Sequence, residues 1–298
     1  MTEVQPPFGR VLTAMVTPMT ADGAIDLDAT QALATHLVDT GNDGLVISGT
    51  TGESPTTTDA EKDQLLRAVA EAVGDRAQVV AGVGTNDTAH SVELAQQAQK
   101  AGATGLLVVT PYYSKPPQAG LLAHFRRVAD AAELPVMLYD IPARSGVPIE
   151  TDTLVELAAH ERIVAVKDAK GDLHQTSQLL ARTDLAVYSG EDALNLPLLA
   201  IGGVGMVSVV AHVCADRFAA LVRAVEAGDL AEARRINASV LPAIRGIMTR
   251  TQGAIMVKAA LQLLGLLAHR TTRSPLIDAT DEQVALLRGD LTEAGLLP

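Results

Sequence analysis

Short apolar runs recur along the first two-thirds of the chain, and most lack the alternation of apolar and polar residues that marks a half-buried strand. Continuous runs of Val, Ile and Leu are typical of parallel strands that are covered on both faces. The pattern therefore predicts eight buried strands, at residues 11–16, 44–49, 78–84, 105–110, 135–140, 163–168, 185–190 and 203–210.

The segments between these runs carry apolar residues at helical spacing. Residues 58–74 begin with a Thr or Asp cap, have Glu61 in capping-box position and end at Gly74. Similar patterns predict helices at 28–41, 87–102 and, more weakly, 172–183. Strands and helices alternate at roughly thirty residues per repeat, which predicts an α/β fold, a (β/α)8 TIM barrel. A doubly wound sheet is the alternative, but "TPMTADG" follows the first strand where a glycine-rich dinucleotide loop would be expected.

The strand-like runs stop after about residue 215, and the rest of the chain is helical in pattern. The segment 216–229 is a candidate for the eighth barrel helix, and the three that follow predict a C-terminal helical appendage. We therefore expect a barrel domain over residues 1–228 and a helical region over residues 229–298. Residues 196–215 have the length of a membrane span, but proline, glycines and polar residues interrupt them, so a buried helix end followed by a buried strand is predicted.

Composition narrows the possible partners and the compartment. The net charge of −12 argues against nucleic acid or an anionic membrane as the main partner, because both need a basic face. Cys214 is the single cysteine, so no intrachain disulfide can form, which fits a reducing compartment. The first ten residues lack the pattern of a signal peptide, and no Cys/His cluster has zinc spacing. We expect a cytoplasmic protein without a bound metal.

Polar and aromatic residues gather where the predicted strands end, which is where TIM barrels carry their active sites. The chain has only four tyrosines and no tryptophan, and the tyrosines all fall at the ends of the fourth, fifth and seventh strands. A single tyrosine there is often a packing residue with one satisfied hydroxyl. Tyr112, Tyr113 and Tyr139 together favour a functional site.

Lys167 ends an apolar run in "IVAVKDAKG" and has two interpretations. It could be a structural lysine paired with a carboxylate such as Asp168. It could instead be a Schiff-base nucleophile, because burial disfavours the charged form of an amine and a neutral amine is what attacks a carbonyl. Lys170 falls past the strand end, and we expect a structural or electrostatic role for it. Similarly, "GTTGES" after the second strand can bind a carboxylate through hydroxyls and exposed N–H groups, or be an ordinary turn.

Five motifs together resemble a known family. They are "GTTGES" (49–54), "TPYYSKPPQAGLLAHF" (110–125), "YDIPARSG" (139–146), "VKDAKG" (166–171) and "SGEDALNL" (189–196). The chain is similar in these motifs to the dihydrodipicolinate synthases, also called 4-hydroxy-tetrahydrodipicolinate synthases. They belong to the superfamily of pyruvate-dependent class I aldolases that includes N-acetylneuraminate lyase. The resemblance extends over essentially the whole chain and is closest to actinobacterial members.

The resemblance implies a lyase that condenses pyruvate with L-aspartate 4-semialdehyde, the first committed step of the diaminopimelate and lysine pathway. It needs no separate cofactor, because pyruvate is held as a covalent imine. It also implies a homotetramer, a dimer of tight dimers. The implied residue roles are the imine-forming lysine (Lys167), the proton-relaying tyrosine (Tyr139), its relay partners Thr50 and Tyr113, the pyruvate carboxylate site (Thr51), the semialdehyde carboxylate site (Arg144), backbone positions near the active site (Gly190, Val207), and the tight interface (Tyr112).

Two other functions stay open at this point. A sugar-acid pyruvate aldolase of the same superfamily would use the same lysine, but it would need hydroxyl-binding groups where Arg144 suits a carboxylate. A non-catalytic binding or scaffold homologue would have no need for the intact set of site residues.

One region departs from the family pattern. Lysine-inhibited members carry His and Glu residues in an allosteric pocket. Here Asn86 is kept, but His90 stands in place of Glu, and Asp59 and Lys62 stand in place of His. Loss of the Glu removes a partner for the ammonium group of the effector, and Lys62 adds like charge. The change predicts weak or absent inhibition by L-lysine.

Overall fold

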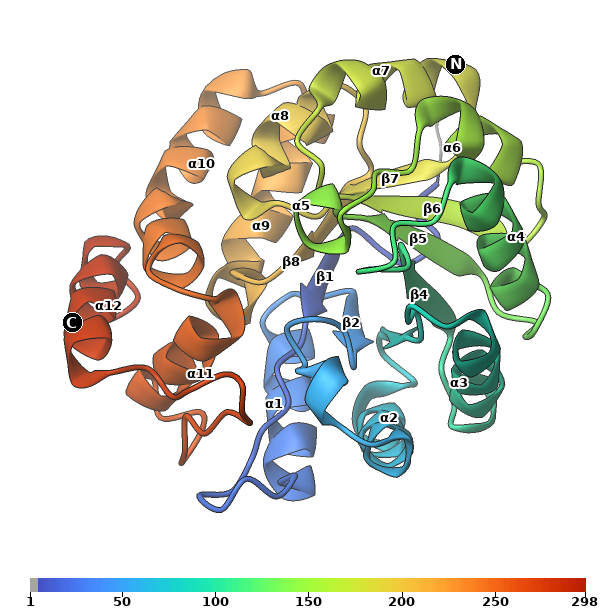
Figure 1. The fold of residues 1–298 in the computed structure, drawn as a ribbon. Coiled ribbons are helices and arrows are strands. Elements are labelled where there is room, and N and C mark those ends of the chain that lie inside the picture. The colour runs from blue at the N-terminus through green and yellow to red at the C-terminus, as the bar shows by residue number, and fades with distance from the viewer. Residues whose placement is uncertain (1–4) are drawn as a thin grey trace.

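Eight parallel strands close into a barrel in the computed structural model, which describes residues 5–298 (Figure 1). Each strand pairs with the next along the chain, and β1 pairs with β8. The (β/α)8 prediction is confirmed, and each strand lies within a predicted apolar run. The strands are β1 (Val11–Ala14), β2 (Gly44–Ile47), β3 (Gln78–Gly82), β4 (Gly105–Val109), β5 (Val136–Asp140), β6 (Ile163–Asp168), β7 (Ala186–Ser189) and β8 (Gly205–Ser208).

Helices surround the barrel, and several begin at the caps that the sequence indicates. The capping box between Thr58 and Glu61 is present at the start of α2, and aspartates cap α1, α3 and α7. α8 contains the helix end predicted at the start of residues 196–215, whereas α4 and α6 have no predicted counterpart; α6 is short, and neither helix has a side-chain cap. The ring comprises α1 (Leu27–Asp39), α2 (Asp59–Val73), α3 (Thr88–Lys100), α4 (Gln118–Ala129), α6 (Thr151–Leu157), α7 (Leu173–Arg182), α8 (Asn195–Ala200) and α9 (Ala211–Glu226).

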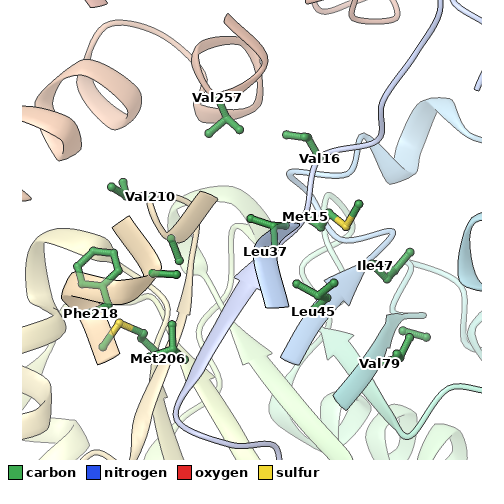
Figure 2. Close-up of a cluster of buried hydrophobic side chains, with 14 of the residues drawn as sticks. Met15, Val16, Leu37, Leu45, Ile47, Val79, Met206, Val210, Phe218 and Val257 are labelled. Atoms are coloured by element: carbon green, nitrogen blue, oxygen red, sulfur yellow. The ribbon is translucent and has the colours of Figure 1, made fainter. Parts of the chain in front are cut away.

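Two apolar layers hold the barrel together. The inner layer fills the barrel and includes Leu12, Val80 and Met137. The outer layer lies between strands and helices and includes Leu45, Val79 and Met206 (Figure 2). Alternate residues of a strand contribute to alternate layers, so every strand residue is covered and no polar alternation is visible in the sequence.

Tyr188 belongs to the floor of the barrel. It is fully buried, and its hydroxyl donates to the carbonyl of Gly9 at 2.9 Å while accepting from the N–H of Phe8 at 3.2 Å. Its ring also lies 6.4 Å from that of Phe8. Tyr188 therefore has a packing role, in contrast to the three tyrosines of the predicted site.

The C-terminal region packs onto the barrel beyond α9. The expected boundary between residues 228 and 229 falls in the turn between α9 and α10 (Leu230–Ile244). A π-helical turn (Arg245–Thr249), α11 (Gly253–Leu263) and α12 (Asp281–Glu293) follow, and α12 lies at the outer edge of the molecule (red in Figure 1). Val257 of α11 belongs to the outer apolar layer (Figure 2).

The membrane-like stretch 196–215 forms most of α8, then β8, then the start of α9, which confirms the predicted helix end and buried strand. Within residues 5–298, no helix has the length and apolar character needed to cross a bilayer.

Candidate active site

Strand register brings Lys167 and Tyr139 side by side. They are direct partners in the β5–β6 pairing, and both side chains point into the barrel, as do Ala165 and Met137 two residues earlier. The Lys167 amine lies 4.3 Å from the centroid of the Tyr139 ring. A lysine and a phenol therefore meet at the C-terminal end of the barrel, where active sites of this fold form.

Burial sets the charge state of Lys167. The residue is 4% exposed, and this burial lowers the pKa of its amine to about 8. The nearby Arg144 charge acts in the same direction, while Asp192 and Glu191 oppose it. At pH 7 about one amine in ten is then neutral, against about one in 3,000 for a lysine with its ordinary pKa. Lys167 is thus available as a nucleophile at neutral pH.

Tyr139 keeps its proton at neutral pH. It is 6% exposed, and burial raises the pKa of the phenol to about 12. The neighbouring Thr50 hydroxyl and the Arg144 charge limit this rise. A protonated phenol beside a second hydroxyl is suited to proton transfer.

The turn after β2 places the threonines of "GTTGES". The N–H of Glu53 donates to the carbonyl of Thr50 at 3.2 Å, and the N–H of Ser54 donates to that of Gly49 at 3.3 Å, which closes a tight turn. Thr17 fastens the turn from outside, because its hydroxyl donates to the carbonyl of Gly52 at 2.7 Å. Thr50 and Thr51 therefore occupy fixed positions above β2.

Two adjoining cavities open at this end of the barrel. The inner one, of about 160 Å³, is lined by Lys167, Tyr139, Thr50, Thr51 and Gly190. The outer one, of about 480 Å³, is lined by Tyr112 and Tyr113 among others. Six residues line both cavities, so the two are continuous: Gly49, Thr50, Leu107, Tyr139, Ile141 and Arg144.

Gly190 and Val207 take different places around the lysine. A Cβ at Gly190 would lie 2.9 Å from Cγ and 3.0 Å from Cε of Lys167, so only glycine leaves room for the lysine chain. Val207, by contrast, is 1% exposed and packs in the inner layer, and it is Val209 that lines the inner cavity. Gly190 thus gives the lysine its space, while Val207 supports the site from below.

Tyr113 is the predicted site residue that this single chain does not bring to the lysine. Its side chain is 88% exposed, and its backbone is in the left-handed region with φ 75°. Tyr112 beside it is half-buried and lines the same outer cavity. Six of the predicted residues therefore converge on the inner cavity, and the tyrosine pair marks its outer rim.

Comparison with known proteins agrees with this geometry. The model of the dihydrodipicolinate synthetase family matches residues 7–294. The chain belongs to the dihydrodipicolinate synthetase family.

Its relatives within the family are similar over nearly their full length. The 4-hydroxy-tetrahydrodipicolinate synthase of Kineococcus radiotolerans is 68% identical over 100% of this chain and 97% of its own. That of Acidothermus cellulolyticus is 67% identical, with 97% and 93% covered. The crystal structure of the enzyme from Cyanidioschyzon merolae with lysine bound has a TM-score of 0.95 and 41% identity, with 98% and 100% covered. The predicted resemblance to actinobacterial members is confirmed.

Lys170 holds the ends of β5 and β6 in this family member. Its amine, in a side chain that is 5% exposed, lies 3.3 Å from Oδ2 of the fully buried Asp140. Its N–H also donates to Oδ1 of Asp168 at 3.1 Å, and the hydroxyl of Thr176 donates to Oδ2 of Asp168 at 2.5 Å. Asp140 and Asp168 follow the inward-facing Tyr139 and Lys167, so they face away from the barrel interior. Asp168 therefore fastens the neighbouring loop and does not pair with Lys167.

Several residues of the site have no counterpart in the sequence predictions. Met248, Gln252, Gly253 and Ala254, from the C-terminal region, line the inner cavity together with Glu191. No periodicity marks them, because they face a cavity made by segments far away in the sequence. Lys258 carries a usable signal, since a lone charge in the apolar helix "AIMVKAALQLLG" needs a buried partner.

Three residues of the expected lysine pocket contact one another. Nε2 of His90 lies 2.9 Å from Oδ2 of Asp59, and Nζ of Lys62 lies 3.6 Å from Oδ1. Lys62 also donates to the carbonyl of Thr57 at 2.6 Å. The Asp59 carboxylate is thus already paired with two groups of its own chain.

Proposed function

We propose that this chain condenses pyruvate with L-aspartate 4-semialdehyde to form 4-hydroxy-tetrahydrodipicolinate, through an imine on Lys167. One observation carries the assignment of the lysine: its amine is buried, partly neutral at pH 7, and lies over the ring of a protonated tyrosine in the inner cavity. The overall reaction is supported by two relatives, 68% and 67% identical, that are 4-hydroxy-tetrahydrodipicolinate synthases. The same relatives favour neither a sugar-acid aldolase nor a non-catalytic scaffold.

The first half of the reaction makes the carbon nucleophile. The neutral amine of Lys167 attacks the keto carbon of pyruvate, and loss of water gives the imine. The protonated imine withdraws electrons, so the methyl group loses a proton and an enamine forms. Tyr139 and Thr50 carry these protons, because both line the inner cavity together with the Lys167 amine. Thr51 is placed to bind the pyruvate carboxylate.

The second half forms the ring. The enamine carbon attacks the aldehyde carbon of the semialdehyde, and a new carbon–carbon bond forms. The substrate amine then displaces Lys167 from the former keto carbon, which closes the ring and frees the enzyme. Arg144 is exposed and lines both cavities, so it can bind the semialdehyde carboxylate as this substrate passes from the outer cavity to the inner one.

We also propose the homotetramer, a dimer of tight dimers, and a cytoplasmic location. Tyr113 supports the tight dimer, since a large aromatic side chain left 88% exposed beside the site is expected to be covered by a partner. In this arrangement Tyr113 completes the hydroxyl relay of the neighbouring subunit. L-Lysine is a weak effector or none, because Asp59, the acidic group at the predicted pocket, is paired with His90 and Lys62.

Borohydride trapping with pyruvate tests the imine. The expected product is one adduct per chain, with the mass of pyruvate less one oxygen atom, on the peptide that contains Lys167. Lys167→Arg should lose both the adduct and turnover, while the fold stays intact. An adduct on Lys170 only, or no adduct, would contradict the assignment. An adduct without turnover of aspartate semialdehyde would instead support a sugar-acid aldolase.

A further inference from the structure

A buried ion pair joins the threonine turn to the C-terminal region. The Glu53 and Lys258 side chains are 1% and 0% exposed, and Nζ of Lys258 is bonded to Oε1 of Glu53. The two residues are 205 positions apart in the sequence. Lys258 also donates to the carbonyl of Thr271 at 2.6 Å, and the N–H of Arg273 donates to Oε2 of Glu53 at 2.9 Å. Both oxygens of the carboxylate are therefore held by the C-terminal region.

Glu53 is in turn the last residue of the turn that carries the site threonines. Its backbone is left-handed, with φ 58° and ψ 36°, a conformation that is strained for a residue with a side chain. Its N–H closes the turn onto the carbonyl of Thr50. The Glu53 carboxylate is thus attached to the same short turn that carries Thr50 and Thr51 at the inner cavity.

Lys258 reaches the opposite wall of the same cavity. It lies one helical turn after Ala254, and Ala254, Gly253 and Gln252 line the inner cavity together with Lys167. The ion pair consequently ties one wall of the cavity, the turn after β2, to the other wall, the start of α11.

Stability alone is a weak reason for such a pair. Both charges lose their hydration on burial, and well-packed apolar residues in place of a buried ion pair are often neutral or stabilising. A buried pair does fix geometry, because separating the two side chains would leave a buried charge without its counter-charge. This pair lies between two segments that line the inner cavity, so its fixed geometry can hold the catalytic groups of those segments at a defined separation.

We propose that Glu53 and Lys258 are positioning residues that set the distance between the Thr50–Thr51 turn and the imine on Lys167. The inference rests on the proposed function. It predicts that breaking the pair lowers kcat by about 10-fold to 100-fold, the effect of displacing a reacting group by up to about 1 Å. The amine of Lys167 itself remains in place, so the imine with pyruvate still forms.

The test uses the double variant Glu53→Gln/Lys258→Met, which removes both charges and leaves neither one unpaired. A second variant, Glu53→Gln, keeps the shape of the side chain and removes a single charge. The control is Arg10→Met/Glu226→Gln, which removes an ion pair at the N-terminal end of the barrel. Each is measured for thermal midpoint, KM for pyruvate, kcat, and borohydride-trapped imine at saturating pyruvate.

The positioning role predicts lowered kcat in the double variant and in Glu53→Gln, with full trapping on Lys167, while the control keeps the wild-type kcat. A double variant with the wild-type kcat would overturn the proposal, and a lowered thermal midpoint beside that kcat would make the pair a purely structural one. Failure of the proposed function is seen separately, because the wild-type enzyme would then give no adduct or no turnover.

Discussion

Gly190→Ala tests whether the space around Lys167 decides its reactivity. The added Cβ would lie 2.9 Å from Cγ and 3.0 Å from Cε of Lys167, and 2.9 Å from Cβ of Ala169. Ordinary carbon contacts are about 3.5–4.0 Å, so the lysine chain has to move by about 0.5–1 Å. This movement changes the position of the amine over the Tyr139 ring.

The expected result is a fall in kcat/KM of about 100-fold, since a misplacement of this size costs that much. Overpacking destabilises the fold by about 1–3 kcal/mol at the same time, which leaves most of the protein folded. A coupled assay gives kcat/KM, and the rate of borohydride trapping at low pyruvate isolates imine formation.

Gly289→Ala is the matched control. Gly289 lies inside α12, and an added Cβ would have no atom within 4 Å. It should keep full activity and gain up to about 1 kcal/mol of stability from helix propensity. A Gly190→Ala enzyme with kcat/KM within about threefold of the wild type would refute the steric reasoning, because the displacement of Lys167 should lower kcat/KM by about 100-fold.

Four further outcomes are expected. Trapping of pyruvate on Lys167 should accelerate about tenfold per pH unit below pH 8 and level off above, because the pKa is lowered to about 8 and only the neutral amine reacts; a flat profile from pH 6 to 9 contradicts this. Arg144→Ala should raise KM for the semialdehyde about tenfold or more and KM for pyruvate much less, as steady-state kinetics with each substrate varied will show. Sub-millimolar L-lysine should leave the rate unchanged in the coupled assay, and inhibition in that concentration range would contradict the prediction. Lys170→Met should destabilise the fold by about 3 kcal/mol in denaturant titrations, because the buried Asp140 loses its partner, and Asp140→Asn added to it should recover most of the loss.

The sequence determined the fold and the chemistry of the central residue. Eight apolar runs at regular spacing, with polar and aromatic residues where the runs end, specify a parallel barrel and locate its reactive end. The same local pattern makes Lys167 a candidate nucleophile, since an amine that ends a strand buried on both faces is expected to lose hydration. Capping signals such as Thr58 with Glu61 are local too, and the structure confirms them.

The role of Lys170 depends on the tertiary structure. Its partner Asp140 is on another strand, 30 positions earlier, and becomes its neighbour only when β5 and β6 pair. Tyr139 and Tyr188 illustrate the same limit, because both end buried strands and yet one serves the cavity and the other the barrel floor. Both side chains belong to the inner layer of the barrel, and they differ in the groups that the closed barrel brings to them, which for Tyr188 are Phe8 and Gly9, about 180 positions away.

The residues that complete the site are identified only by the tertiary structure, in which the C-terminal helices pack against the closed barrel. Met248 and Gln252 line the cavity, and Lys258 holds Glu53, through contacts between segments about 200 residues apart. A lone lysine in an apolar helix signals that a buried partner exists, because an unpaired buried charge is too costly. The identity of the partner carboxylate is decided by the packing of α11 against the barrel. No local stretch of sequence specifies that packing.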